Sequence, residues 1–231
     1  MFLYIYIIIC LIKIINAIVL KDGNDFIDNL SKSSNSVTLN IKSKIDITRE
    51  IKINESIKKL HITGDSLNTA TLNLNYPLYF DSKIEEIEIK DININGILFF
   101  KKNNKKITLD NVNLNGYIDS DFNYDSDNDV EITKFNYKPM RDSVENCINL
   151  SGNIKISRSN FYGSSSCRNR LLHYDGFDKY KFELKDSNFN GENECLFLEI
   201  ENALKANIET SYFENGYSSR NTDGGYMKKI K

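Results

Sequence analysis

Apolar and polar residues alternate one by one through short segments spread along this chain. Successive side chains of a β-strand point to opposite faces, so such alternation predicts strands with one buried face. The segments are Val37–Ile41, Lys44–Thr48, Glu50–Asn54, Thr71–Asn75, Glu86–Lys90 and Lys106–Asp110. Helical spacing occurs in one short stretch, Asp25–Ser33, where Phe26 and Leu30 would share one side of a helix. We therefore expect an all-β protein with one short helix.

A short sequence frame recurs along the chain. An aliphatic residue is followed by an aliphatic residue or serine at the third position, an aliphatic residue or phenylalanine at the fifth, and glycine at the seventh. The copies are Ile57–Gly64, Ile89–Gly96, Leu109–Gly116, Ile156–Gly163 and Leu184–Gly191, with a longer copy at Ile208–Gly216. The glycines lie 32, 20, 47, 28 and 25 residues apart, and the interval of 47 would hold two units, one of them unmarked. Such a period with strand content is typical of a solenoid.

The frame is consistent with a strand, a corner and a second strand. The third position would sit at the corner, the fifth would return to the core, and the glycine would supply a positive φ. Two-residue hairpin signals are rare, so stacked parallel coils are favoured over an antiparallel sheet. Equivalent side chains would then lie about 4.8 Å apart, and the frame asparagines would form a ladder of amide hydrogen bonds. These asparagines are Asn93, Asn113, Asn160 and Asn188.

A further pattern within Ser211–Ile230 supports a family resemblance. Its members are Phe213, Asn215, Gly224, Gly225 and Tyr226. With the coil length and a helix near Phe26 that would cap the N-terminal end of the core, it resembles the right-handed parallel β-helix proteins of the pectin-lyase-like superfamily. The resemblance covers about Asp22 to the end and implies a right-handed parallel β-helix. That superfamily holds lyases, hydrolases and surface adhesins, so the fold alone assigns no function. Because the chain stops at Lys231 just after a coil begins, we expect the domain of residues 18–231 to be truncated at its C-terminal end.

The N-terminal residues form an apolar run, Phe2–Ile15, interrupted only by Lys13 and followed by a small residue, Ala17. The run is short for a membrane span and typical of a signal peptide. We expect residues 1–17 to be a cleaved signal peptide, which makes the mature chain secreted or cell-surface, without a membrane span. An uncleaved anchor is the alternative.

Secretion changes the interpretation of the cysteines and asparagines. Cys10 would leave with the signal peptide, so an odd number of cysteines remains and at most one internal disulfide can form. Cys147, Cys167 and Cys195 remain; Cys147 and Cys167 are a candidate pair, although other pairings stay open. N-glycosylation sequons begin at Asn29, Asn54 and Asn149.

An acidic segment offers weak calcium candidates. Asp125, Asp127, Asp129 and Glu131 alternate with other residues, and a loop with such spacing presents several carboxylates. An EF-hand would have glycine at the sixth position and glutamate at the twelfth, which this segment lacks. A solvated loop that protrudes from the coil is therefore the favoured interpretation, with no metal or cofactor expected and calcium as the alternative.

Several residues are candidates for contact with polysaccharide. Arg168, Arg170, His173 and Asp175 would suit an anionic polymer, while Tyr117, Tyr124 and Tyr137 would stack on sugar rings. The segment Asn221–Gly224 is similar to an Asn-Thr-Asp-Gly segment of polygalacturonase-like hydrolases. The further carboxylates that such catalysis needs do not follow it, so a coil turn is the simpler interpretation. His61 is expected to face outward from its strand.

Composition limits the function further. The formal net charge is -2 and no basic stripe is present, which argues against nucleic acid and anionic membranes as partners. We expect a non-catalytic secreted or cell-surface β-helix that binds glycans or surface partners. The alternatives are a carbohydrate-active enzyme, either a lyase or a glycoside hydrolase, and an inactive truncated product.

Overall fold

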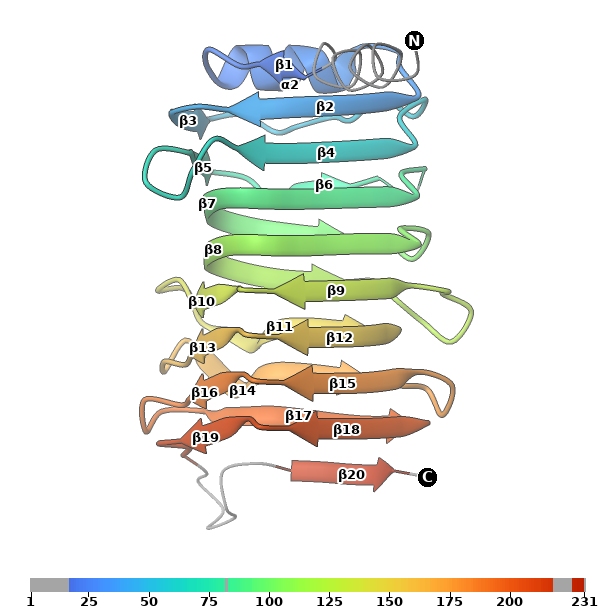
Figure 1. Cartoon of the computed structure of the whole chain (residues 1–231), viewed down its shortest axis with the longest axis vertical. Helices are drawn as coiled ribbons and strands as arrows, with labels where there is room; N and C mark the ends of the chain where they lie inside the picture. The colour runs from blue at the N-terminus through green and yellow to red at the C-terminus, as the bar shows by residue number, and fades with distance from the viewer. Residues whose placement is uncertain (1–16, 82, 218–225, 231) are drawn as a thin grey trace, which may run out of the picture.

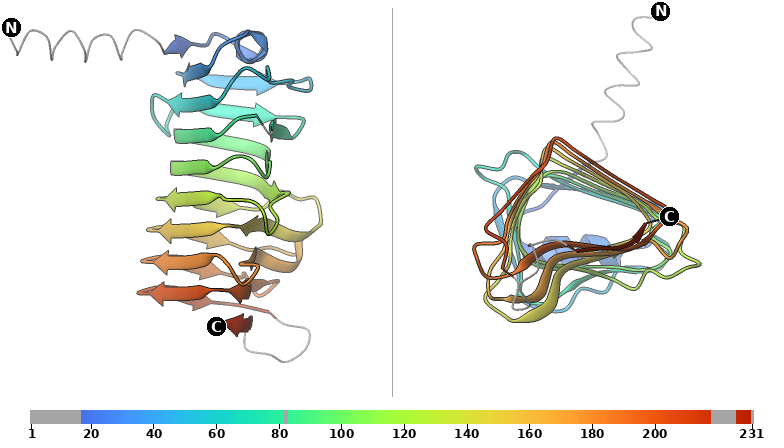
Figure 2. Two further views of the ribbon diagram at one scale, coloured as in Figure 1. Left: turned by 90° about the vertical axis from the view of Figure 1, so that its right-hand side faces the viewer. Right: turned by 90° about the horizontal axis from the view of Figure 1, so that it is seen from below.

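The computed structural model describes residues 17–81, 83–217 and 226–230, the last segment by its backbone alone. Most of the expected signal peptide and the segment Asn221–Gly224 lie outside the described residues. The described chain is a parallel β-solenoid of about eight turns. The turns stack along one axis from the N-terminal to the C-terminal end (Figure 1), and each has a roughly triangular outline when seen along that axis (Figure 2).

The strands of the turns form three faces. The first face contains β2 (Ser36–Ile41), β4 (Lys59–Gly64), the starts of β7 (Glu86–Phe100) and β8 (Lys106–Ser120), β9 (Asp129–Thr133), β12 (Asn153–Ser157), β15 (Lys181–Lys185) and β18 (Lys205–Glu209). The second face contains β3 (Lys44–Ile47), β5 (Thr71–Leu74), the middles of β7 and β8, β10 (Asn136–Lys138), β13 (Asn160–Tyr162), β16 (Asn188–Asn190) and β19 (Tyr212–Glu214). The third face contains β6 (Leu78–Phe80), the ends of β7 and β8, β11 (Val144–Ser151), β14 (Cys167–Asp175), β17 (Leu196–Ala203) and β20 (Tyr226–Ile230). A short strand, β1 (Ile18–Val19), pairs with β2.

The interior of the solenoid is filled by the inward side chains of all three faces. In β7 and β8 the inward residues are mainly isoleucine and leucine, and they are fully buried. Toward the C-terminal end, aromatic rings take the same place on the second face. Phe161 and Phe189 stack with their ring centroids 4.4 Å apart. Parallel stacking of equivalent positions therefore brings like side chains into contact along the axis.

The recurring frame sets the register of most turns. Asn93 pairs with Asn113, and Asn160 pairs with Asn188, as the frame predicts. The unmarked unit within the interval of 47 residues is the turn through Ile132–Pro139, because Asn136 pairs with both Asn113 and Asn160. Phenylalanine and proline stand there at the third and seventh positions, which hides this unit from the pattern.

The copy at Ile57–Gly64 does not stack as the frame predicts. Ile62 pairs with Ile89, so the strand part of this segment, Lys59–Gly64, lies on the first face. Leu72 occupies the position next to Ile94 on the second face instead. Apolar alternation is compatible with more than one register, and the closure of the whole turn selects among them.

The corner between the first and second faces depends on one residue with left-handed backbone. Its φ lies between 45° and 56°, and it occurs at Asp91, Asn111, Lys134, Arg158, Asp186 and Thr210. This corner residue lies one position earlier in the frame than expected.

The expectation that the frame glycines supply a positive φ was largely wrong, since among the described frame glycines only Gly96 has a positive φ. A Cβ on Gly116 would overlap the carbonyl oxygen of Gly96, so close stacking of the coils requires glycine there.

The helix α2 (Gly23–Ser31) lies at the N-terminal end of the stack (Figure 1). Asp22 precedes it, and its Oδ1 accepts hydrogen bonds from the backbone N–H groups of Asn24 and Asp25. Such capping satisfies donors that the first helical turn leaves free. Phe26 and Leu30 are fully buried in the core.

The alternating segment Glu50–Asn54 is not a strand, so this prediction was wrong. Ile51 and Ile53 are nevertheless buried, as the alternation indicates. The backbone N–H of Asn54 donates to the carbonyl oxygen of Leu30 at 2.8 Å. The segment therefore lies against the end of helix α2, and this bond takes the place of a strand ladder.

Within the described part of the chain, no helix has the length and hydropathy needed to cross a membrane.

Candidate functional site

The outer surface of the second face carries a column of asparagines from five consecutive turns. Each side-chain amide donates to the side-chain oxygen of the asparagine in the preceding turn, at 2.8 or 2.9 Å. The column contains Asn93, Asn113, Asn136, Asn160 and Asn188. The amide of Asn93 ends the series by donating to the backbone oxygen of Ala70. The predicted ladder is thus confirmed, with Asn136 as an additional member.

Short strands after a sharp corner place these side chains outside. In β10, only the middle residue Tyr137 is buried, while Asn136 and Lys138 are exposed. In β8, the residues Val112 and Leu114 on either side of Asn113 point into the core. Period-two geometry therefore forces the asparagine out once the corner is made.

The ladder leaves hydrogen-bonding groups free on its outer side. A carboxamide has two N–H donors and two lone pairs on its oxygen. In the three inner amides of the column, those of Asn113, Asn136 and Asn160, the ladder bonds use one donor and one lone pair, so one of each remains for a ligand or water. The face thus presents donors and acceptors together at the spacing of one coil, about 4.8 Å.

A second polar column runs beside the first. Asn95 donates to Asn73, and Asn73 donates in turn to the carboxylate of Asp46. The hydrogen bond from Asn73, assisted by Lys44, lowers the pKa of Asp46 below its ordinary value. Asn115 continues this column, because it pairs in register with Asn95.

Two exposed tyrosines stand at the C-terminal part of the second face. Tyr162 is 36% exposed, and the ammonium of Lys138 in the preceding turn lies 5.2 Å from its ring centroid. Tyr212 is 72% exposed and follows Asn188 in the ladder column. Both rings can pack on an apolar ligand surface while their hydroxyls stay in water.

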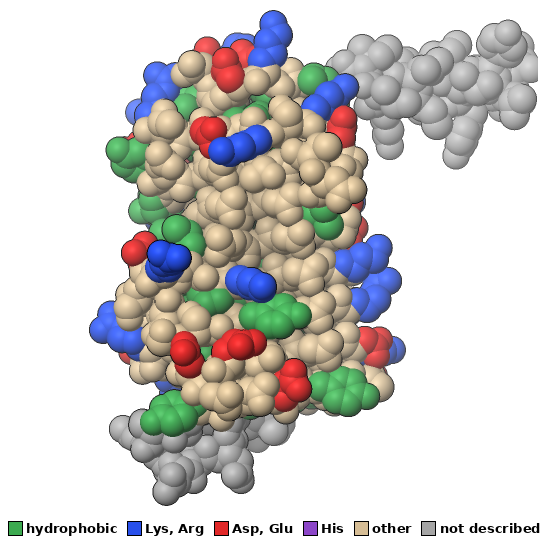
Figure 3. All heavy atoms as spheres, turned by 90° about the vertical axis from the view of Figure 1, so that its left-hand side faces the viewer, with side chains coloured by type: hydrophobic (Ala, Val, Ile, Leu, Met, Phe, Trp, Pro, Cys, Tyr) green, Lys and Arg blue, Asp and Glu red, His purple; other side chains and the backbone are tan. Residues whose placement is uncertain are grey.

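The second face differs from the first in charge. Figure 3 shows the second face, where backbone and uncharged side chains, drawn in tan, make up much of the surface and charged side chains are scattered, mainly along its margins and toward its C-terminal end. The first face carries acids and lysines side by side and has an open hollow of about 460 Å³. Residues of this hollow include Lys106, Asp129, Glu131, Lys155 and Glu183. His61 also faces outward there, with its Nδ1 3.5 Å from an oxygen of Glu88.

The third face brings together two of the predicted polysaccharide residues, Arg170 and His173. Arg170 forms an ion pair with Glu199 of the next turn, whose side chain is 7% exposed. His173 lies beside the same carboxylate, with Nε2 3.8 Å from Oε2. Arg168 is exposed, and Asp175 instead accepts hydrogen bonds from the backbone of Phe177 and the side chain of Asn202.

The tyrosines expected to stack on sugars do not lie together on the surface. Tyr117 and Tyr137 are 4% and 0% exposed, so for these two residues the prediction was wrong. Burial raises the pKa of both phenols, and the Tyr137 hydroxyl donates to the backbone oxygen of Gly116. Tyr124 is 61% exposed, on the loop between β8 and β9.

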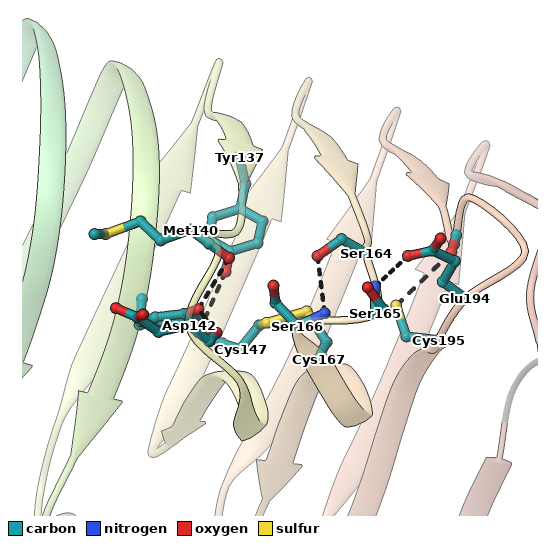
Figure 4. The surroundings of a disulfide bond; sticks show 12 residues. Tyr137, Met140, Asp142, Cys147, Ser164, Ser165, Ser166, Cys167, Glu194 and Cys195 are labelled. Atoms are coloured by element: carbon teal, nitrogen blue, oxygen red, sulfur yellow. Dashed lines mark hydrogen bonds between the residues drawn. A yellow bond between two sulfur atoms is a disulfide. The ribbon is translucent and has the colours of Figure 1, made fainter.

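Cys147 and Cys167 form a disulfide that joins β11 to the first residue of β14 in the next turn of the solenoid. Their Cα atoms lie 5.3 Å apart (Figure 4). Cys195 is a buried free thiol on the following turn. Burial raises the pKa of the Cys195 thiol to about 11.

The three sequon asparagines already make hydrogen bonds. Asn29 donates to the backbone oxygen of Asp25, and Asn54 donates to that of Ser31. Asn149 lies on the third face, where its amide donates to Asp119. Glycosylation of these residues stays a prediction.

The four acids proposed for calcium divide between two places. Asp125 and Asp127 are exposed on the loop before β9, whereas Asp129 and Glu131 belong to β9 and face outward. Among the described residues, no three of these acids bring carboxylate oxygens within 4.8 Å of one another. A calcium site there stays a prediction.

Sequence patterns did not identify Asn136, Glu199 or Glu201 as site residues. Asn136 sits in the unmarked turn, and its position could have been found by placing one more unit in the long interval. Glu199 and Glu201 lie in the segment Leu196–Ala203, whose apolar run carries no frame. Their proximity to His173 arises only from the stacking of turns.

No family model, no curated protein and no solved structure matches this chain.

Proposed function

We propose that this protein is a non-catalytic, extracellular or cell-surface binding protein whose second face binds an uncharged polysaccharide lying along the solenoid axis. The observation that carries this proposal is the continuous hydrogen-bonded column from Asn93 to Asn188.

The chemistry of the face favours a hydroxyl-rich ligand. A sugar hydroxyl both donates and accepts, so it pairs with the free N–H and free lone pair of a ladder amide. The amides are held by their neighbours before the ligand arrives. Less side-chain entropy is therefore lost on binding than with mobile residues. Because the ladder itself is uncharged, it offers nothing that selects an anionic polymer.

The repeat of the face favours a polymer over a single sugar. Equivalent amides recur once per coil, about 4.8 Å apart, so a chain along the axis meets the same groups repeatedly. Each contact is weak, but linked contacts add affinity through their high effective concentration. Tyr162 and Tyr212 extend the face with rings on which sugar rings can pack.

The proposal also covers the structural class of the solenoid and the cellular compartment of the protein. The chain would be a right-handed β-helix of the pectin-lyase-like type, since parallel crossovers are right-handed in nearly all known sheets. Residues 1–17 would be its signal peptide, and helix α2 would cap the core. The disulfide between Cys147 and Cys167 fits secretion, because such bonds persist in oxidising compartments.

A sedimentation assay tests the binding proposal. The purified chain from Ile18 onward is mixed with insoluble cellulose, chitin or β-1,3-glucan, and separately with immobilised polygalacturonate as the anionic probe. We expect at least one neutral polymer to retain the protein, with little loss at high salt, because screening weakens charge pairs and not neutral hydrogen bonds.

Matched variants locate the binding face. Asn113→Thr combined with Asn160→Thr keeps polar side chains suited to strands but removes the amides, and retention should fall about tenfold. Asn153→Ala removes an outward asparagine from the first face and should bind as the wild type does. Equal retention of all three proteins, or retention by polygalacturonate alone, would contradict the proposal. Release of soluble sugar from the polymer would identify an enzyme instead.

A further inference from the structure

The third face holds a cluster of three metal-ligating side chains from two adjacent turns. His173 comes from β14, and Glu199 and Glu201 come from β17, with one potential ligand atom of each within 4.8 Å of the others. Strand pairing sets this arrangement, because His173 lies opposite Glu199 in the register. Residues i and i+2 of a strand share a face, so Glu201 points to the same side as Glu199.

The hydrogen bonds of Asn149 determine which nitrogen of His173 carries a proton. An ionised carboxylate can only accept, so Asn149 must direct its NH₂ group to Asp119, at 3.1 Å. Its oxygen then faces Nδ1 of His173 at 2.9 Å, and that nitrogen must donate. In the neutral ring, the lone pair is therefore on Nε2.

Nε2 points at two carboxylates without contacting either at hydrogen-bond distance. It lies 3.8 Å from Oε2 of Glu199 and 3.5 Å from Oε2 of Glu201. N–H···O hydrogen bonds are normally about 2.7–3.2 Å long. Ligand atoms about 2.1 Å from a tetrahedral zinc ion lie about 3.4 Å from one another. The observed separations fit ligands around a cation better than a direct hydrogen bond.

We propose that His173, Glu199 and Glu201 bind one divalent transition-metal ion of the zinc type. A neutral imidazole whose other nitrogen donates to a fixed acceptor is the usual form of a metal-bound histidine. One nitrogen and two carboxylate oxygens suit Zn²⁺, Co²⁺ or Mn²⁺, whereas Ca²⁺ and Mg²⁺ prefer oxygen ligands alone.

Arg170 is a positioning residue in this arrangement. Its guanidinium holds both oxygens of Glu199, and its Nη2 lies 2.7 Å from Oε1. A carboxylate has about four lone-pair positions, so Oε2 keeps one for the metal. With Arg170 counted, the cluster has a net charge of about -1 before the metal binds, which still attracts a cation.

Isothermal titration of the metal-free protein with ZnCl₂, and Co²⁺ absorption in the visible range, test this site. We expect one ion per chain and a higher unfolding temperature with the metal, because the ion would link β14 to β17. His173→Asn and Glu201→Gln should each weaken binding about 100-fold. Asp119→Asn, which frees the orientation of Asn149, should weaken it about tenfold.

His61→Asn is the matched control. Among the described residues, His61 and Glu88 form the histidine–carboxylate pair outside this cluster, on the first face, and this change should leave the affinity unaltered. The proposal is overturned if the wild type binds neither ion or if His173→Asn binds equally well. It is also overturned if Ca²⁺ or Mg²⁺ displaces Zn²⁺ at equal concentration. The test is independent of polysaccharide retention, which uses the second face.

Discussion

Asn136 donates its side-chain amide to the side-chain oxygen of Asn113 across 2.9 Å, although the two residues are 23 positions apart. This bond joins two turns of the solenoid on the outside of the second face. The inner amides of the column, those of Asn113, Asn136 and Asn160, are each both donor and acceptor, so neighbouring bonds polarise one another. The column thus connects the stability of the turns with the surface proposed to bind polysaccharide.

Replacing the middle of the ladder should cost stability. Asn136→Ala removes one bond to Asn113 and one from Asn160. Because both partners remain open to water, the free energy of unfolding should fall by only about 1 kcal/mol. Urea denaturation measures this change in the free energy of unfolding. Asn115→Ala is the control, since Asn115 has no side-chain hydrogen bond within the described residues, and an equal loss in both variants would contradict the role of the ladder.

The ion pair of Arg170 and Glu199 should respond unequally to removal of its two partners. Arg170→Met strands a carboxylate whose side chain is 7% exposed and should cost about 3 kcal/mol. Glu199→Leu should cost about 1 kcal/mol, because the arginine side chain is 24% exposed and can reach water. The double variant should be more stable than Arg170→Met. Additive losses in metal-free urea titrations would show that the two groups are not coupled.

Alkaline pH should destabilise the protein through its buried acids. The Cys195 thiol ionises near its ordinary pKa of 9.0 when unfolded, and burial raises that pKa to about 11 in the fold. The unfolded state therefore loses its proton first, and the stability present below pH 9 is lost as the pH rises through about 11. Burial also raises the pKa of Tyr137 well above its ordinary 10.0, which acts in the same direction.

Urea titrations at pH 8 and pH 10.5 measure this loss. Cys195→Ala should show a smaller drop between the two pH values than the wild type, because one ionising group is gone. Identical drops would mean that the thiol does not contribute.

The left-handed corners should accept glycine more readily than the strands do. Arg158 has a φ of 52°, so Arg158→Gly relieves backbone strain and should raise the free energy of unfolding by about 0.5 kcal/mol. Lys155→Gly, in the neighbouring strand β12, should lower it by about 1 kcal/mol. Thermal and urea unfolding of both variants measure the signs. A loss in Arg158→Gly as large as that in Lys155→Gly would show that the corner carries no strain.

Local pattern predicted much of the architecture because each strand is short and strictly alternating. The strands that begin at Glu86 and Lys106 form as expected and continue around the following corners as β7 and β8. The segment Glu50–Asn54 has the same alternation but does not pair as a strand, since helix α2 lies beside it. Alternation indicates which side chains are buried, whereas strand pairing depends on which segment of the chain lies beside them in the fold.

The candidate sites divide in the same way. The ladder was predictable, because its members repeat within a frame and parallel stacking places equal positions together. Tyr137 shows the limit of that approach. It occupies the fifth, inward position of its turn, but Phe135 and Pro139 hide the frame there, so its burial could not be recognised.

The amino-acid sequence by itself determined that this chain forms stacked parallel turns and that the frame asparagines face outward. Both follow from period-two alternation and a recurring corner, which are local properties. Tertiary structure alone decided that His173 meets Glu199 and Glu201. Those residues are 26 and 28 positions apart in the chain, and turns of unequal length make their register a result of packing the whole core.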